Sequence, residues 1–177
     1  MTEKVIIAGF GGQGVMSMGQ MLAYSGMNEN KEVSWLPSYG PEMRGGTANC
    51  QVIVSDEPIA APIISMADTV IAMNLPSLDK FESRVKEGGN LFINSSLIER
   101  KAKRDDINVY YIDANELALE IGNSKVAGMT VIGAYLKVTN IVKEETVIES
   151  LKKVLGKKKL DLIPVNERAM EKGAEQV

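Results

Sequence analysis

Short apolar runs that predict strands alternate with longer stripes that predict helices along this 177-residue chain. Strands are expected where β-branched and other apolar residues gather, at residues 4–8, 33–36, 48–55, 69–73, 91–93 and 109–112. Helices are expected at residues 15–27, 77–86, 113–121, 129–142 and 147–155, and more weakly after residue 166. This alternation indicates an α/β fold, a three-layer Rossmann-like single domain over residues 1–177 with a mainly parallel sheet.

Several local signals refine this outline. The strand at 48–55 is expected to run antiparallel, because no helix precedes it. Gly88 and Gly89 are expected to end the helix at 77–86, and Gly122 with Asn123 the helix at 113–121. Asp113 and Glu116 form a predicted capping box for that second helix. Gly133 lies inside an almost entirely apolar helix, where it would let a neighbouring element approach closely.

Composition excludes several classes of function. The net charge is −3, from 20 basic and 23 acidic residues, which gives no support for nucleic-acid binding. Lys157, Lys158 and Lys159 form the one tight basic cluster, which is either a solvated loop or a phosphate site. With Cys50 as the single cysteine and no histidine, zinc, haem and iron–sulfur sites are not expected on this chain.

Cysteine use and hydropathy also bear on where the protein works. A single cysteine allows no internal disulfide, which fits a reducing cytoplasm. The apolar run after Lys4 is too short for a signal peptide, and no apolar stretch approaches the ~20 residues that span a bilayer. A cytoplasmic protein without a membrane segment is therefore expected.

A glycine-rich turn lies between the first strand and the first helix. It contains Gly9, Gly11, Gly12, Gln13 and Gly14, with the G-x-G-x-x-G spacing. Backbone N–H groups at a helix start suit a phosphate, but nicotinamide or flavin dinucleotides also need a carboxylate after the second strand. That strand ends in Trp-Leu-Pro-Ser instead. A tight turn without a ligand, another phosphate-bearing group and a partner chain stay open. Gln13 could orient a ligand or bind a neighbouring backbone.

A second loop, from Ser38 to Thr47, holds more than turn residues. Arg44 presents a planar fork suited to a carboxylate or a phosphate, and Glu42 in the same loop could pair with it. The candidate binding residues of this loop are Ser38, Tyr39, Gly40, Glu42, Arg44, Gly45 and Gly46.

Taken together, residues 9–15 and 38–48 closely resemble the gamma subunit of 2-oxoacid:ferredoxin oxidoreductases, a family that includes the pyruvate, 2-oxoglutarate and 2-ketoisovalerate enzymes. The resemblance runs over essentially the whole chain. Residues 67–73 and the pairs Gly122-Asn123 and Gly133-Ala134 look like further markers of the family. One departure is Gly128, where an asparagine is expected, and it weakens any polar role at that position.

The resemblance implies a chain without catalytic residues of its own. The complex would convert a 2-oxoacid, coenzyme A and oxidised ferredoxin into acyl-CoA, carbon dioxide and reduced ferredoxin. It would use thiamine diphosphate, Mg²⁺ and iron–sulfur clusters held by alpha and beta subunits and, in some complexes, a small delta subunit. This chain would bind no cofactor alone, would help to bind coenzyme A, and could form a homodimer when expressed alone.

Two rival functions stay open at this level. One is a free-standing nicotinamide-dependent reductase with a Rossmann-like domain, which the missing acidic residue after the second strand disfavours. The other is a phosphate-ligand binding module with no catalytic partner. Within the resembled family, the wording of the second loop favours 2-oxoglutarate or a branched-chain 2-oxoacid over pyruvate as the substrate of the complex.

Overall fold

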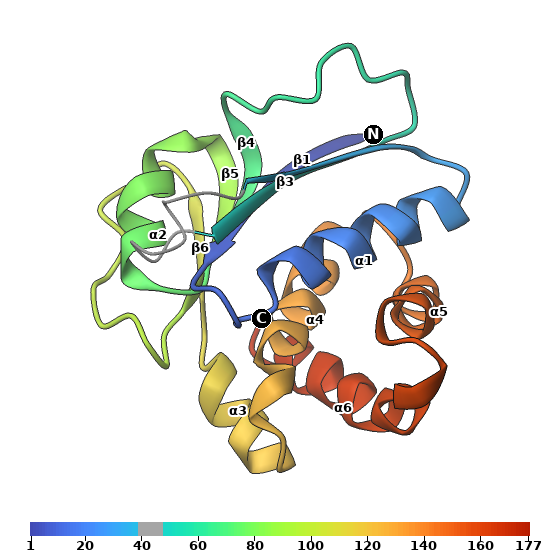
Figure 1. The fold of residues 1–177 in the computed structure, drawn as a ribbon. Coiled ribbons are helices and arrows are strands. Elements are labelled where there is room, and N and C mark those ends of the chain that lie inside the picture. The colour runs from blue at the N-terminus through green and yellow to red at the C-terminus, as the bar shows by residue number, and fades with distance from the viewer. Residues whose placement is uncertain (39–47) are drawn as a thin grey trace.

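The computed structural model describes residues 1–38 and 48–177 (Figure 1). Its strands are β1 (Thr2–Gly9), β2 (Glu32–Ser38), β3 (Ala48–Ser55), β4 (Ala67–Ala72), β5 (Val85–Asn94) and β6 (Asn108–Ile112). Its α-helices are α1 (Val15–Asn28), α2 (Leu75–Phe81), α3 (Ala114–Ile121), α4 (Ala127–Thr139), α5 (Glu144–Leu155) and α6 (Ile163–Ala174). Short 3₁₀ segments are η2 (Glu82–Arg84), η3 (Ser124–Val126) and η4 (Lys157–Leu162). The α/β prediction is confirmed.

The strands form one sheet in the order β2-β3-β1-β4-β5-β6. β3 is antiparallel to both of its neighbours, whereas β1, β4, β5 and β6 pair in parallel. The predicted direction of β3 is therefore confirmed, and the sheet is mainly parallel. The physical reason is the short sequence between β2 and β3, since a parallel crossover needs a dozen or more residues.

The two faces of the sheet are covered unequally. Helices α1, α3, α4, α5 and α6 contribute to one core, with the side chains of β1 and β3 that face α1. The opposite core receives only α2 among the helices, together with Ile64 and Ile98 from two connecting loops. Figure 1 shows α1, α4, α5 and α6 gathered below the sheet, and the loop from β3 to β4 rising above it. The fold thus has three layers, one of which is thin.

The predicted helix at 77–86 is wrong at its end. α2 stops at Phe81, and after a short 3₁₀ turn the fully buried Val85 begins β5 opposite Ala67. Gly88 has φ 74° and lies where the β4–β5 register shifts, so this glycine belongs to a bulge within a strand. A glycine that follows a helical pattern predicts a helix stop, whereas strand pairing with β4 decides the role of Gly88.

The capping box predicted for α3 is also wrong. The Asp113 side chain gives α3 no cap, and it accepts instead from the Ser95 hydroxyl at 2.6 Å. The oxygen that caps α3 comes from Ser96, which accepts from the N–H groups of Asn115 (3.1 Å) and Glu116 (3.2 Å). The predicted stop at Gly122 is confirmed, with φ 92° and the N–H of the next residue bonded to Ala118 O.

The buried helix predicted at 129–142 is confirmed in type, although α4 starts and ends earlier than expected. Asn140 ends it in the left-handed conformation, with φ 50°. Gly133 lies against the backbone of α6, where an added Cβ would stand 2.0 Å from Met170 O. The close approach predicted at this glycine is therefore confirmed, and α6 is the neighbour.

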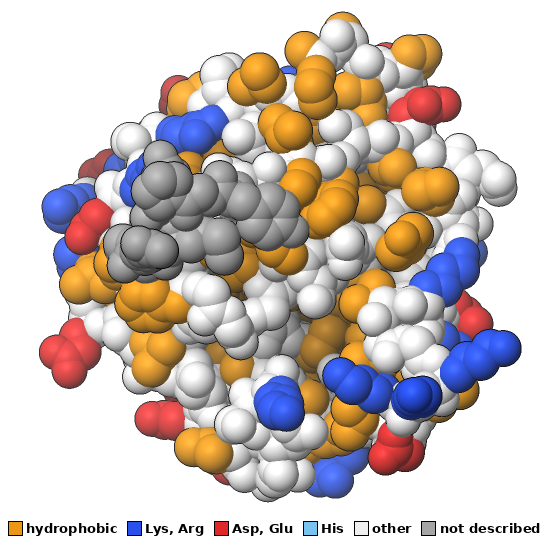
Figure 2. All heavy atoms as spheres, viewed as in Figure 1, with side chains coloured by type: hydrophobic (Ala, Val, Ile, Leu, Met, Phe, Trp, Pro, Cys, Tyr) orange, Lys and Arg blue, Asp and Glu red, His pale blue; other side chains and the backbone are white. Residues whose placement is uncertain are grey.

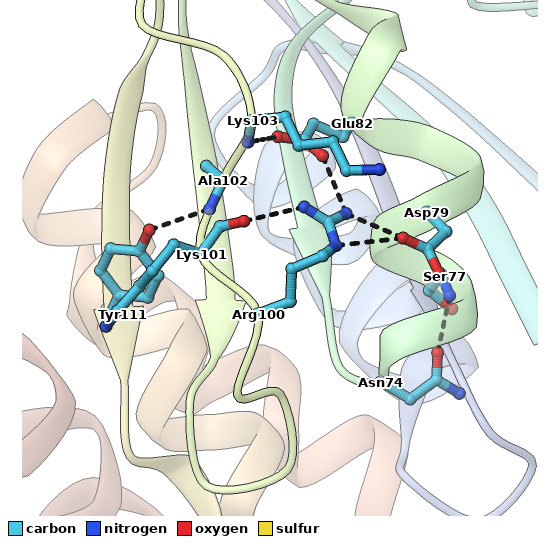
Figure 3. Close-up of polar contacts among 9 residues, drawn as sticks. All are labelled: Asn74, Ser77, Asp79, Glu82, Arg100, Lys101, Ala102, Lys103 and Tyr111. Atoms are coloured by element: carbon cyan, nitrogen blue, oxygen red, sulfur yellow. Dashed lines mark hydrogen bonds and ion pairs between the residues drawn. The ribbon is translucent and has the colours of Figure 1, made fainter.

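A polar clip holds the loop between β5 and β6 against the α2 layer (Figure 3). The side chain of Glu82 is only 7% exposed. Its carboxylate pairs with Arg100 at 2.9 Å and accepts a hydrogen bond from the N–H of Lys103. Arg100 also pairs with Asp79, and the Tyr111 hydroxyl accepts from the N–H of Ala102 at 3.0 Å. These polar contacts add to the apolar anchoring of the loop through Ile98, Ala102 and Ile107.

Candidate functional site

The glycine turn lies at the carboxyl end of β1, at a topological switch point. The helix that follows β1 packs on one face of the sheet, and the helix that follows the adjacent parallel strand β4 packs on the other. In open α/β sheets such a point leaves a crevice where ligands bind. The position predicted for the glycine turn, between the first strand and the first helix, is confirmed.

Two glycines of the turn adopt backbone conformations that other residues avoid. Gly12 has φ 91° and Gly14 has φ 77°, and the space where each Cβ would stand is open. Gly14 is the N-cap of α1 and contributes no side chain, so the first N–H groups of that helix have no side-chain cap. Beside them lies a hollow of about 300 Å³ lined by Phe10, Gly11, Gly12, Gly14, Val15, Met16, Ser17 and Ala48. This geometry suits a phosphate or another anion.

The side chain of Gln13 fills the crevice itself. Its Oε1 accepts from the N–H of Phe10 at 2.6 Å, and its Nε2 donates to Met73 O at 3.2 Å. Gly9 makes room for this arrangement, because a Cβ there would stand 2.6 Å from Gln13 Oε1. Of the two roles predicted for Gln13, binding of a neighbouring backbone is the one observed. The amide ties β1 to β4 where a dinucleotide pyrophosphate would enter.

Strand order gives a second reason against a dinucleotide. In the Rossmann arrangement the ribose carboxylate follows a strand adjacent to β1. Here β3 lies between β1 and β2, so the end of β2 is two strand spacings, about 10 Å, from the end of β1. The residues at that end are Pro37 and Ser38. An acidic residue there would be badly placed for the ribose.

The sheet brings the two loops singled out in the sequence to one edge. β1 and β2 both run antiparallel to β3, and the register pairs Gly9 with Ala48 and Ser38 with Asn49. The end of β1, the end of β2 and the start of β3 therefore share an edge. Ser38, predicted as the first residue of the second loop, is instead the last residue of β2. Tyr39, Gly40, Glu42, Arg44, Gly45 and Gly46 lie outside the described residues, and their roles stay predictions.

Sequence reasoning missed a buried amide next to this edge. Asn94, at the carboxyl end of β5, donates through Nδ2 to Met73 O (3.3 Å) and to Asn115 Oδ1 (2.8 Å). Met73 O thus receives bonds from both Asn94 and Gln13. Among the described residues the Asn94 Oδ1 is one of four buried side-chain oxygen or nitrogen atoms without a partner. The available signal was a polar residue directly after the apolar run 91–93.

Titratable groups with strongly raised pKa values lie outside the glycine turn. Burial raises the pKa of Glu3 to about 7. Glu3 lies near the start of β1, away from the glycine turn, and its carboxylate accepts a hydrogen bond from the Thr69 hydroxyl on β4. Burial likewise raises the pKa of the Cys50 thiol to about 12, which makes it a poor nucleophile. Within residues 1–38 and 48–177, no group of three acidic, cysteine or histidine side chains is placed to hold a metal ion.

The helices carry no membrane signal. In the part of the chain that the structure describes, none of them combines the length and the apolar content that crossing a bilayer requires. The helix with the most buried surface, α4, lies inside the domain against α6.

The sequence matches a known protein family and several of its described members. The family described as pyruvate ferredoxin/flavodoxin oxidoreductase matches residues 4–176. The ketoisovalerate oxidoreductase subunit VorA of Methanothermobacter marburgensis is 37% identical over 175 residues, which are 97% of this chain and 36% of that protein. The chain thus spans about a third of the length of this relative.

Two solved structures share the fold. The gamma subunit of a keto/oxoacid ferredoxin oxidoreductase from Geobacter sulfurreducens superposes with a TM-score of 0.83 and 26% identity, covering 98% of this chain and 97% of that one. A 2-oxoglutarate:ferredoxin oxidoreductase from Magnetococcus marinus, solved with 2-oxoglutarate, coenzyme A and succinyl-CoA bound, superposes with a TM-score of 0.88 and 24% identity. It covers 99% of this chain, which corresponds to 31% of that longer chain.

Proposed function

This chain belongs to the pyruvate ferredoxin/flavodoxin oxidoreductase family, and we propose that it serves as the gamma subunit of a cytoplasmic 2-oxoacid:ferredoxin oxidoreductase. The complex converts a 2-oxoacid and coenzyme A to acyl-CoA and carbon dioxide and passes the electrons to ferredoxin. The observation that carries the proposal is the family match over residues 4–176, which contains both glycine-rich loops. Their joint emergence at one sheet edge supports a shared task.

The proposed division of labour leaves the chemistry to partner chains. Thiamine diphosphate with Mg²⁺ and the iron–sulfur clusters belong to the alpha and beta subunits, with a delta subunit in some complexes. The described part of this chain offers backbone N–H groups, amides and hydroxyls at the candidate edge. Its proposed work is to help bind coenzyme A and to complete the assembly.

Coenzyme A is the proposed ligand because its phosphates match the candidate edge. The first turn of α1 presents N–H groups beside a hollow of about 300 Å³, and glycines leave the approach open. Arg44 belongs to the loop that leaves β2 at the same edge, and its guanidinium suits a phosphate. We propose 2-oxoglutarate or a branched-chain 2-oxoacid, ahead of pyruvate, as the substrate of the complex. The VorA relative, a ketoisovalerate oxidoreductase subunit, favours the branched-chain acid.

Activity of the isolated chain is the first test. With no histidine and a single, buried cysteine, the purified chain should not reduce a viologen dye with any 2-oxoacid plus coenzyme A. The same chain reconstituted with its alpha and beta subunits should. Dye reduction by rigorously purified chain alone would favour the free-standing reductase and contradict the subunit role.

Arg44→Lys tests the role in coenzyme A binding. Lysine keeps the charge but loses the planar fork. We expect a complex that assembles normally with a KM for coenzyme A raised about 10- to 100-fold, since a charge-assisted hydrogen bond contributes roughly 1.5–3 kcal/mol. Steady-state kinetics with varied coenzyme A measure this, and the KM for the 2-oxoacid is the internal control. A weaker complex with an unchanged KM would instead assign Arg44 to a partner chain. Wild-type values throughout would leave either an internal pair with Glu42 or a solvated Arg44.

A further inference from the structure

The loop between β3 and β4 replaces a helix as the cover of one sheet face. On that side α2 packs over β1 and β4, whereas the side of β3 that bears Gln51 and Ile53 meets the loop. Ile64 is 1% exposed and Ile59 is partly buried, and both pack into the core on this side. The layer over β3 is therefore one loop thick.

This loop is far longer than its connection requires. It joins the end of β3 to the start of β4, which both flank β1, so it crosses about 10 Å, or roughly three extended residues. It uses residues 56–66 instead. Connections in compact domains are most often about 4–6 residues long, so this one is longer than usual.

The loop is held in place at both of its ends. The N–H of Glu57 donates to Ser55 Oγ at 3.0 Å, and the N–H of Ile64 donates to Gln51 Oε1 at 2.6 Å. The Arg84 guanidinium donates to the carbonyl oxygens of Ile64 and Ser65. Pro58 and Pro62 further restrict the backbone. Such a surface loses little conformational entropy when a partner binds it.

The outward side of this ordered loop is apolar. Ile63 is 70% exposed and Met66 is 47% exposed, and the exposed residues Ala60, Ala61 and Pro62 lead up to them. Leu36 on neighbouring β2, 39% exposed, pairs in register with Gln51 and so faces the same side. Figure 2 shows hydrophobic side chains gathered at the top of the molecule, where Figure 1 places this loop. We name residues 60–63, Met66 and Leu36 the β3–β4 patch.

We propose that the β3–β4 patch is the docking surface for a catalytic partner chain, the counterpart of the additional polypeptide in the longer relatives. This inference rests on the proposed function. The VorA relative has about two thirds of its length beyond the region that matches this chain. An ordered apolar patch with no charged side chain among its members fits a partner surface of apolar residues, which would bury Ile63 at its centre.

A recess beside the patch gives such a partner an anchoring point. It measures about 360 Å³ and lies between β2, β3 and α2, with Leu36, Gln51, Phe81 and Arg84 among its lining residues. The described residues place no carboxylate in ion-pair contact with Arg84, whose guanidinium donates to two carbonyl oxygens and lies over the Phe81 ring. A partner side chain seated there would continue the contact made at Ile63.

Ile63→Glu tests the docking surface, with Leu119→Glu as the matched control. Leu119 is 66% exposed on α3, on the opposite side of the sheet, so both changes place one carboxylate on an exposed apolar residue. Each variant is co-expressed with the alpha and beta chains from the same source, and assembly is followed by sedimentation velocity. We expect Leu119→Glu to assemble like the wild type, and Ile63→Glu to weaken assembly at least tenfold. Melting temperatures of the isolated chains should be unchanged.

The outcomes separate this inference from the function on which it rests. A wild-type chain that does not assemble with the alpha and beta chains contradicts the proposed function and removes the inference with it. Normal assembly of Ile63→Glu, or equal loss in both variants, overturns the docking surface alone. An isolated wild-type dimer that Ile63→Glu abolishes, beside an intact complex, would identify a second copy as the occupant and also overturn it. Ala61→Glu replaces Ile63→Glu if that variant misfolds.

Discussion

Gly133→Ala is expected to destabilise the fold by at least about 3 kcal/mol, and to leave much of the chain unfolded if its stability is typical of single domains. The new Cβ would stand 2.0 Å from Met170 O and 2.6 Å from both Met170 C and Met170 Cα. These are backbone atoms of a helix, so no side-chain rotation can relieve the overlap. The reciprocal position shows the same contact, since a Cβ on Gly173 would stand 1.7 Å from Thr130 O.

Urea unfolding followed by circular dichroism measures this effect, with Gly128→Ala as the control on the same helix. A Cβ at Gly128 meets the Met18 sulfur at 2.9 Å, which is the flexible end of a side chain. Alanine also favours the helix by up to about 1 kcal/mol, so this variant should stay within about 1 kcal/mol of the wild type. A Gly133→Ala chain as stable as Gly128→Ala would show that α4 and α6 do not pack backbone to backbone.

Glu82→Ala is expected to cost about 3 kcal/mol of unfolding free energy, because it removes one partner of a largely buried ion pair. Of its two carboxylate partners Arg100, whose side chain is 22% exposed, would keep Asp79, which is 52% exposed. The N–H of Lys103 would lose its acceptor as well. The loop that connects β5 to β6 should then detach from the α2 layer (Figure 3).

Asp79→Ala is the matched control for this clip. It removes the other carboxylate from Arg100, but an exposed pair contributes only about 0–1 kcal/mol. Thermal unfolding gives the two free-energy changes, and hydrogen exchange of residues 100–104 reports whether the loop opens. Equal small losses in the two variants would mean that Glu82 does not hold the loop.

Much of the secondary structure followed from local pattern. The apolar runs at 4–8 and 69–73 became β1 and β4, and the stripe after Val15 became α1. The predictions are wrong where a residue distant in the sequence decides the local structure. The glycine at 88 predicts a helix stop, because the bulge opposite β4 leaves no local signal in the sequence. The predicted cap of α3 is wrong because the capping oxygen comes from Ser96 on another loop. Short-range propensities do not encode such pairings.

The candidate site divides in the same way. The sequence by itself determined the family, the glycine turn between strand and helix, and the absence of an acidic residue at the end of the second strand. Only the tertiary structure decided that Gln13 occupies the crevice, that β3 separates β1 from β2, and that both glycine-rich loops leave one edge. The spacing of glycines in the sequence indicates where the backbone can adopt unusual conformations, which is a local property. What stands beside a glycine depends on strand order and on contacts between residues far apart in the chain.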